Sequence, residues 1–183
     1  MSGDYDLGVS PSAENTAPAP DDQSALNAPS RRVICRSEDA TNALGTALAA
    51  CLRPGDIIAL SGPMGAGKSH LARAMIRAAA GDPDMLVPSP TFTLANVFET
   101  QLGEIWHADL YRIADPEELE EIGLLDHTMD RVVLVEWPER WPDMPADHLE
   151  IHISPVGPDE RQFEFVAASN GWRARLAALD FPE

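Results

Sequence analysis

Residues 62 to 69 carry the clearest chemical signal in the chain. Their sequence, GPMGAGKS, matches the phosphate-binding pattern GxxxxGK(S/T) at every fixed position. Glycines adopt backbone angles that other residues avoid, and successive N–H groups in such a loop form a concave nest for anionic oxygens. The ammonium of Lys68 can reach the outer phosphates of a nucleotide, and the hydroxyl of Ser69 can ligate Mg²⁺. The loop therefore predicts a site for a phosphorylated ligand.

The segments that flank this loop supply the structural context that the pattern requires. The apolar run 56–61 predicts a buried strand before the loop, and residues 71–78 predict a helix after it. A helix that begins near Lys68 points the positive end of its dipole at a bound anion. We expect the nucleotide to contact Gly62, Gly65, Ala66, Gly67, Lys68, Ser69 and His70.

Lys68 is the one lysine of the chain, and the remaining positions among the 13 Lys and Arg residues are all arginine. A compact point charge suits a phosphate loop better than a planar guanidinium does. Guanine-specific nucleotide sites normally use an NKxD loop, which would need a second lysine. The sequence therefore excludes a GTPase of that type and favours ATP as the nucleotide.

Two carboxylates follow predicted strands at the points where the strands end. Asp109 closes a strand that begins near residue 105, and Glu136 closes the apolar run 131–136. Ligands of open α/β sheets bind at the carboxyl ends of the strands. Glu136 is therefore a candidate metal ligand together with Ser69, and Asp109 is a candidate for positioning the attacking water or the metal shell. The alternative for Glu136 is an acid at a strand end that faces solvent.

Two further residues have open roles. Thr91 follows two prolines that hold residues 87–90 extended, so it is either a sensor of the terminal phosphate or a surface threonine at the start of a strand. Phe92 and Leu94 suggest that this strand begins directly after Pro90. Trp137, next to Glu136, either covers the site or fills the core.

The remaining pattern predicts an α/β fold of three layers, with a mainly parallel sheet and a C-terminal antiparallel strand pair. We expect a strand at 32–36, a helix at 38–52 capped by Ser37, a short helix opened by Asp115 and stopped by Gly123, strands at 149–153 and 162–166, and a last helix to about residue 179. Carboxylates at 117, 118, 120 and 121 favour a solvated helix face over a metal site. Residues 1–30 predict a disordered acidic tail, and residues 31–183 a single ATPase domain.

Bulk properties narrow the class of protein. The formal net charge of −17 argues against a chain that grips nucleic acid by itself, and favours protein partners. Cys35 and Cys51 are too few for a disulfide framework, so free thiols in a reducing cytoplasm are expected. The sequence contains no apolar run of membrane-spanning length and no signal-peptide pattern at its start. We expect a cytoplasmic protein without a membrane partner.

Five short motifs occur in an order that resembles the TsaE family. They are the phosphate loop, SPTFTL at 89–94, HADLYR at 107–112, DPEELE at 115–120 and VEWPE at 135–139. The resemblance covers about residues 32–168. It implies a small P-loop fold and weak Mg²⁺-dependent ATP hydrolysis. It also implies joint action with TsaD and TsaB in the threonylcarbamoyl modification of adenosine 37 in tRNAs reading ANN codons, with tRNA contacted through that complex.

The resemblance also implies roles for individual residues. Ser69 and Glu136 would hold the metal, Asp109 and Trp137 would be needed for activity, and Thr91 would lie in a switch-like segment. Thr41 and Arg161 fall near positions that flank the adenine in the family. Ser69 and His70 stand where the family more commonly has two threonines, and the serine retains the hydroxyl that a metal needs.

Two other functions remain open from the sequence. A small-molecule kinase would fit the length and the phosphate loop, but it needs cationic groups over the transferred phosphoryl group, and the arginines after the loop are scattered. A nucleotide-dependent interaction switch with little hydrolysis is the second alternative. The absence of an evident arginine finger predicts low intrinsic turnover unless a partner supplies catalytic groups.

Overall fold

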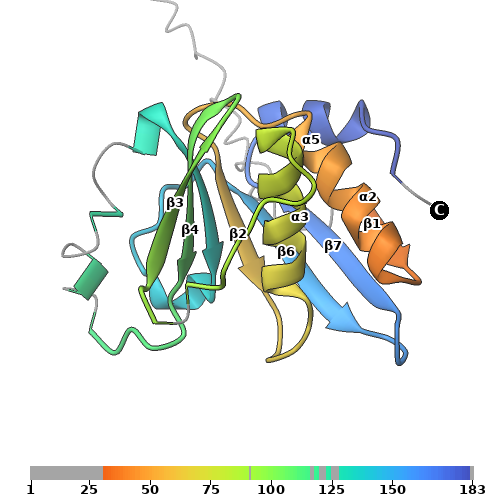
Figure 1. Ribbon diagram of the computed structural model, residues 1–183, viewed down its shortest axis with the longest axis horizontal. Helices are drawn as coiled ribbons and strands as arrows, with labels where there is room; N and C mark the ends of the chain where they lie inside the picture. Colours follow the sequence, from red (N-terminus) through yellow and green to blue (C-terminus); the bar gives the residue numbers. More distant parts are fainter. Residues whose placement is uncertain (1–30, 91, 116–117, 120–122, 125–127, 182–183) are drawn as a thin grey trace, which may run out of the picture.

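A computed structural model describes residues 31–90, 92–115, 118–119, 123–124 and 128–181. Seven strands form one sheet in the order β1-β7-β6-β2-β5-β4-β3 (Figure 1), which confirms the predicted α/β class. The predicted tail at 1–30, Thr91, and the carboxylates at 117, 120 and 121 lie outside the described residues.

The strands are β1 (Arg31–Cys35), β2 (Ile57–Ser61), β3 (Ala95–Thr100), β4 (Gly103–Asp109), β5 (Val132–Glu136), β6 (Leu149–Pro155) and β7 (Arg161–Ala167). The helices are α2 (Glu38–Ala49), α3 (Lys68–Ala80) and α5 (Asn170–Ala177), with short 3₁₀ turns η1 (Thr128–Asp130) and η2 (Pro138–Arg140). Ser37 caps α2 through its side chain, as the sequence predicts, and Ser169 caps α5 in the same way.

The four central strands, β4, β5, β2 and β6, are mutually parallel. Every residue of β5 is buried, and all of β2 except Ser61, because both faces of the sheet are covered there. The predicted antiparallel pair at the C-terminus is confirmed as β6 and β7. β1 and β3 add an antiparallel strand at each edge of the sheet.

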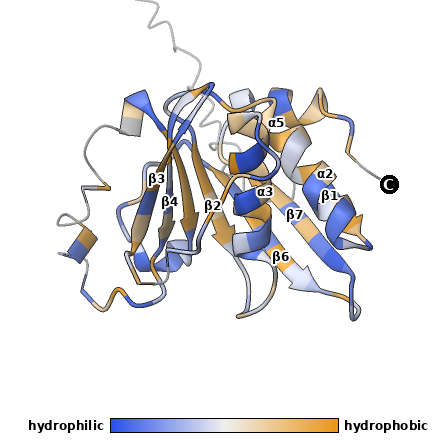
Figure 2. Ribbon diagram, viewed as in Figure 1, coloured by the Kyte–Doolittle hydropathy of each residue, from blue (hydrophilic) through white to orange (hydrophobic). Residues whose placement is uncertain are grey.

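The two faces of the sheet are covered in different ways. Helices α2 and α3 pack side by side, and Gly45 allows them to approach so closely that a Cβ there would meet the side chain of Ala74. Their apolar side chains join those of α5 in one core cluster. Over β2, β4 and β5, the other face is covered by irregular segments that contribute Leu110, Ile113 and Trp141. Figure 2 shows the apolar residues concentrated on the strands beneath these layers.

Two details of the sequence prediction need correction. The strand after Pro90 begins at Ala95 and not at Phe92, because Leu94 has a left-handed φ of 63° and its N–H closes a turn onto the carbonyl of Pro90. The side chain of Phe92 is consequently exposed. The last strand begins at Arg161, one residue before its predicted start at residue 162.

One contact of the helix start predicted at Asp115 is present in the structure. The side chain of Glu118 accepts a hydrogen bond from the backbone N–H of Asp115 at 3.0 Å, which is half of a capping box.

Cys35 and Cys51 are both free thiols. Within the described ranges, none of the helices has the length and apolar character that crossing a bilayer requires.

Candidate functional site

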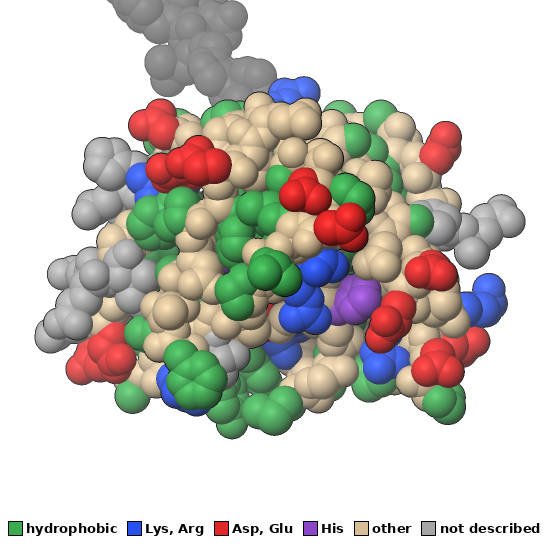
Figure 3. Space-filling view, viewed as in Figure 1, with side chains coloured by type: hydrophobic (Ala, Val, Ile, Leu, Met, Phe, Trp, Pro, Cys, Tyr) green, Lys and Arg blue, Asp and Glu red, His purple; other side chains and the backbone are tan. Residues whose placement is uncertain are grey.

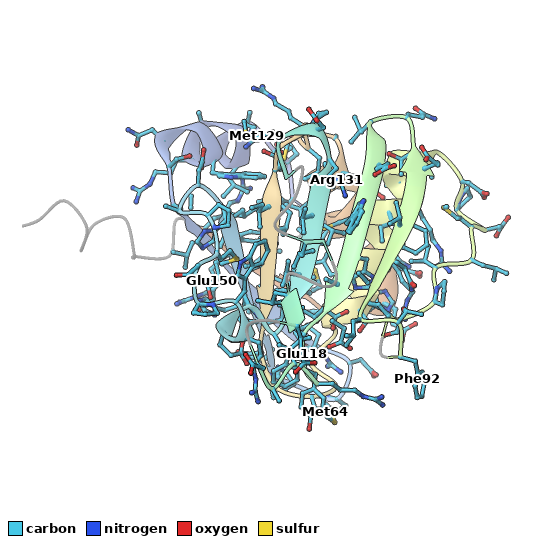
Figure 4. The ribbon with its side chains drawn as sticks, turned by 90° about the vertical axis from the view of Figure 1, so that its left-hand side faces the viewer. Met64, Phe92, Glu118, Met129, Arg131 and Glu150 are labelled. Carbon is cyan, nitrogen blue, oxygen red and sulfur yellow. The ribbon has the colours of Figure 1, made fainter. Side chains whose placement is uncertain are left out.

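The parallel core brings the carboxyl ends of three strands to one edge of the sheet. Glu136 at the end of β5 lies beside Asp109 on β4 and beside Leu60 on β2. Figure 4 shows Met64 and Phe92 at this end of the molecule, opposite Met129 and Arg131. The predicted loop, metal ligand and water-positioning residue are therefore neighbours in space.

The phosphate loop has the backbone that its glycines predict. Gly62, Gly65 and Gly67 have φ values of 137°, 74° and 110°. A Cβ on Gly62 would also overlap the carbonyl oxygen of Ile153 on β6. Gly67 caps α3 without a side-chain hydrogen bond, so the N–H groups of the first turn remain available to an anion.

The ammonium of Lys68 is folded back onto the loop that carries it. Its Nζ donates to the carbonyl oxygens of Gly62 at 2.8 Å and of Pro63 at 2.9 Å. The same nitrogen lies 3.9 Å from the centre of the Trp137 ring, a cation–π distance. A phosphate oxygen would therefore compete with two backbone carbonyl oxygens for this ammonium.

Burial lowers the pKa of Lys68 below its ordinary value. The carboxylates of Glu136, Asp109 and Glu139 act in the opposite direction and favour the charged form. Two of these acids, Glu136 and Asp109, are themselves buried beside the loop. The neighbouring carboxylates thus stabilise the positive charge of Lys68 against the cost of its burial.

Ser69 and Glu136 form the pair that the sequence predicts as metal ligands. The hydroxyl of Ser69 donates to Glu136 Oε2 at 2.9 Å, and the carboxylate is almost wholly buried. Adjacent ligands of an octahedral Mg²⁺, at about 2.1 Å each, lie about 3 Å apart. The two oxygen donors therefore fit Mg²⁺ with little movement. The described residues contain no cluster of three His, Cys, Asp or Glu side chains that could hold a metal.

Asp109 and Trp137 line the same cavity as this pair. Asp109 Oδ1 accepts the backbone N–H of Tyr111 at 3.1 Å, which fixes the carboxylate at the strand end. Trp137 has left-handed φ and ψ of 62° and 55°, an uncommon conformation for a bulky residue that points to a functional constraint. Its ring lies 5.0 Å from that of Tyr111. The indole thus forms one wall of the site, over Lys68.

Two cavities adjoin the phosphate loop. The first, of about 530 Å³, is lined by the loop residues Met64 to His70, the strand-end residues Asp109 and Glu136, and also Arg73, Ser89, Tyr111, Arg112 and Trp137. The second, of about 460 Å³, shares Gly65, Gly67 and His70 with the first. Both have the size of small-molecule sites. A ligand could extend from one cavity to the other along the loop.

The second cavity brings together Thr41 and Arg161, which lie far apart in the sequence. Thr41 is buried, and its hydroxyl donates to the carbonyl of Ser37 at 3.2 Å. Arg161 donates to carbonyls of its own turn, including that of Pro158 at 3.2 Å. His70, between the cavities, bonds through Nε2 to Asn42 Oδ1 at 2.9 Å, and burial lowers its pKa.

His107 belongs to the site although sequence reasoning gave it no role. Its ring is wholly buried, and Nε2 lies 2.8 Å from Glu136 Oε1. The period of two in a strand places residues 105, 107 and 109 on one face. The sequence could therefore have indicated His107 as a site residue, because it lies two positions before Asp109 on the same strand face.

The surface around the helices agrees with the overall acidity. Figure 3 shows acidic side chains distributed over the face that carries α2, α3 and β3, with a small group of basic side chains and a histidine near its centre. Arg112, at the cavity, stacks on the exposed ring of Phe92 at 4.8 Å. The basic side chains on this face are scattered and form no extended stripe among the described residues.

Comparisons with known proteins show which family this chain resembles. The family model described as "Threonylcarbamoyl adenosine biosynthesis protein TsaE" matches residues 35–163. The tRNA threonylcarbamoyladenosine biosynthesis protein TsaE of Rickettsia bellii is 34% identical over 131 residues, which cover 71% of this chain and 90% of that protein. The TsaE protein of Aquifex aeolicus is 40% identical over 124 residues, 67% and 87% of the two chains.

The fold has a solved counterpart. The crystal structure of Bacillus subtilis YdiB superposes with a TM-score of 0.65 at 26% identity, and covers 80% of this chain and 91% of that one. The sequence matches reach from β1 to β7 and contain both cavities described above. The chain therefore belongs to the TsaE family of threonylcarbamoyl adenosine biosynthesis proteins.

Proposed function

We propose that this chain binds and hydrolyses ATP, with Mg²⁺, as the nucleotide-hydrolysing subunit of the machinery that installs threonylcarbamoyl on adenosine 37 of tRNAs reading ANN codons. Its partners would be proteins of the TsaD and TsaB type, and its location the cytoplasm. Family membership supports the pathway. The observation that carries the ATPase assignment is the phosphate loop with Lys68 set beside the hydrogen-bonded pair of Ser69 and Glu136.

Water would attack the γ-phosphorus in line with the bond to the β-phosphate oxygen, which leaves with ADP. The loop N–H groups and the Lys68 ammonium would hold the phosphate oxygens and stabilise the charge that develops on them. Asp109, fixed at the end of β4, would orient the water. Ser69 and Glu136 are the residues that would hold Mg²⁺, which supplies positive charge to the outer phosphate oxygens when it is bound.

The adenosine half of the nucleotide would occupy the second cavity. Thr41, Arg161 and His70 line it, and the loop residues Gly65 and Gly67 are common to both cavities. This arrangement supports a nucleotide that lies along the loop, with its phosphates toward Glu136.

The test is phosphate release by the purified chain with ATP and Mg²⁺. We expect Lys68→Ala to lower the rate by about 10²-fold or more, because it removes the cation that stabilises the transferred phosphoryl group. Glu136→Ala should lower the rate similarly but leave nucleotide affinity in EDTA within about twofold, since the carboxylate would act through the metal. Near-normal turnover in Lys68→Ala would refute the assignment.

Glu99→Ala provides the matched control, because it removes an exposed carboxylate of β3 that lines neither cavity. Its rate should stay close to that of the wild type. A small-molecule kinase is the second candidate, favoured by the two arginines, Arg73 and Arg112, that line the phosphate cavity. ADP formed from ATP in a metabolite extract without an equal amount of inorganic phosphate would support the kinase instead.

A further inference from the structure

The carboxylate of Glu136 is held at both of its oxygens. Oε2 accepts the hydroxyl of Ser69 at 2.9 Å, and Oε1 lies 2.8 Å from Nε2 of His107. The two partners approach from different elements, α3 and β4. A carboxylate with one free oxygen can rotate about its last bond, whereas this one is restrained in its plane.

The ring of His107 is placed by the strand beneath the site. His107 pairs with Leu134 in the register of β4 and β5, two residues before Asp109 pairs with Glu136. Its side chain therefore lies on the same sheet face as both carboxylates but one step deeper. The ring is wholly buried and lines neither cavity, so it has no access to a nucleotide.

The surroundings of Nδ1 indicate which ring nitrogen of His107 carries a proton. Nδ1 is buried without a hydrogen-bond partner among the described residues. A proton on Nδ1 would bury an unpaired donor, whereas an unprotonated Nδ1 leaves only an unused lone pair. Nε2 therefore carries a proton, and this N–H donates to Glu136 Oε1.

We propose that His107 is the positioning residue of the candidate metal site: its Nε2–H fixes the Glu136 carboxylate so that Oε2 faces the cavity beside Ser69. This inference rests on the metal role given to Ser69 and Glu136 above. Partners that orient a metal ligand typically change metal affinity by about 10–100-fold when they are removed. Phosphate binding by the loop does not involve His107, so nucleotide affinity without metal should be insensitive to it.

A matched pair of variants isolates the N–H donor. Gln and Met have unbranched side chains of nearly the same length, and the Gln amide can donate where Nε2 does, whereas Met cannot. With Mn²⁺ as the probe, metal binding to the chain saturated with ADP is measured by electron paramagnetic resonance. ADP affinity in EDTA and the melting temperature are measured on the same samples.

We expect H107M to weaken Mn²⁺ binding by about 10–100-fold and H107Q by much less, with ADP affinity in EDTA within about twofold of wild type for both. Equal Mn²⁺ affinity in wild type, H107Q and H107M would overturn the inference. Parallel loss of Mn²⁺ and ADP binding in both variants would also overturn it, because it would indicate a purely structural role. If the wild-type chain with ADP binds no Mn²⁺, the metal assignment itself fails.

A measurement on the wild-type chain serves if the variants do not fold. In ¹⁵N spectra of the imidazole rings, His107 should show a protonated Nε2 and an unprotonated Nδ1. Its Nε2–H signal should shift when Mg²⁺ is added to the ADP complex, since the acceptor carboxylate becomes a metal ligand. A proton on Nδ1, or a signal unchanged by Mg²⁺, would overturn the proposal.

Discussion

His70 lies between the two cavities and makes the site sensitive to pH at the level of one residue. Burial is the main cause that lowers its pKa below 6.5, with Glu38 opposing and Arg73 adding to the shift. The folded state therefore binds a proton on this ring less readily than the unfolded state does. The contribution of His70 to the free energy of unfolding is largest above about pH 6.5 and is lost as the pH falls toward the lower folded pKa.

Replacement of His70 by Gln keeps a donor for Asn42 but removes the titration. We expect the free energy of unfolding of His70→Gln to fall less than that of the wild type between pH 7 and pH 5, measured by urea denaturation in matched buffers. Identical pH profiles for the two proteins would show that the pKa of His70 is the same in the folded and the unfolded state.

Individual side chains of the site were predictable to different degrees. The loop residues, Asp109 and Glu136 follow from fixed spacing and from strand ends, and the structure brings them together. His107 carries the same information in its position, but its role depends on which carboxylate oxygen it meets across two strands. That contact depends on side-chain rotamers and strand register, which a single sequence does not specify.

At the scale of elements, the junction of β2 with the phosphate loop depends on one glycine. Gly62 combines a φ of 137° with close approach to the carbonyl oxygen of Ile153 on β6. Gly103 also has a positive φ, of 95°, but open space around it. A comparison of the two glycines therefore separates the effect of the backbone conformation from the effect of the close contact.

We expect Gly62→Ala to destabilise the fold by about 3 kcal/mol and to abolish nucleotide binding, because the loop must move away from β6. Gly103→Ala should cost only about 1–2 kcal/mol, the strain of a left-handed residue, and should leave nucleotide binding intact. Chemical denaturation and titration with a fluorescent ADP analogue measure both quantities. Equal losses in the two variants would refute the role of the β6 contact.

The predicted elements were most reliable where both pattern and capping agreed. β2, α3 and β5 are bounded close to their predicted ends, since apolar runs and glycines determine them locally. The start of β3 was missed, because Leu94 adopts a left-handed conformation that no residue type signals and that a turn onto Pro90 stabilises. The antiparallel edge position of β1 beside β7 depends on contacts across most of the chain.

At the scale of the whole molecule, charge decides which partner the chain can bind unaided. With a net charge of −17, it should not retain tRNA at physiological salt, because phosphate contacts need clustered Lys and Arg. In a mobility-shift assay we expect no complex of the chain with tRNA alone, and a complex only when TsaD- and TsaB-type proteins are added. A salt-dependent shift by the chain alone would contradict this reading.

The solitary lysine has a practical consequence for studying the protein. Apart from the α-amino group at the start of the chain, Lys68 offers the sequence's one primary amine to acylating reagents. Its ammonium is enclosed by two carbonyl oxygens and an indole ring, so a bound triphosphate and an amine-directed label would compete for one nitrogen. Mass spectrometry of a single adduct can therefore report the occupancy of the loop in the unmutated protein, even inside a larger assembly.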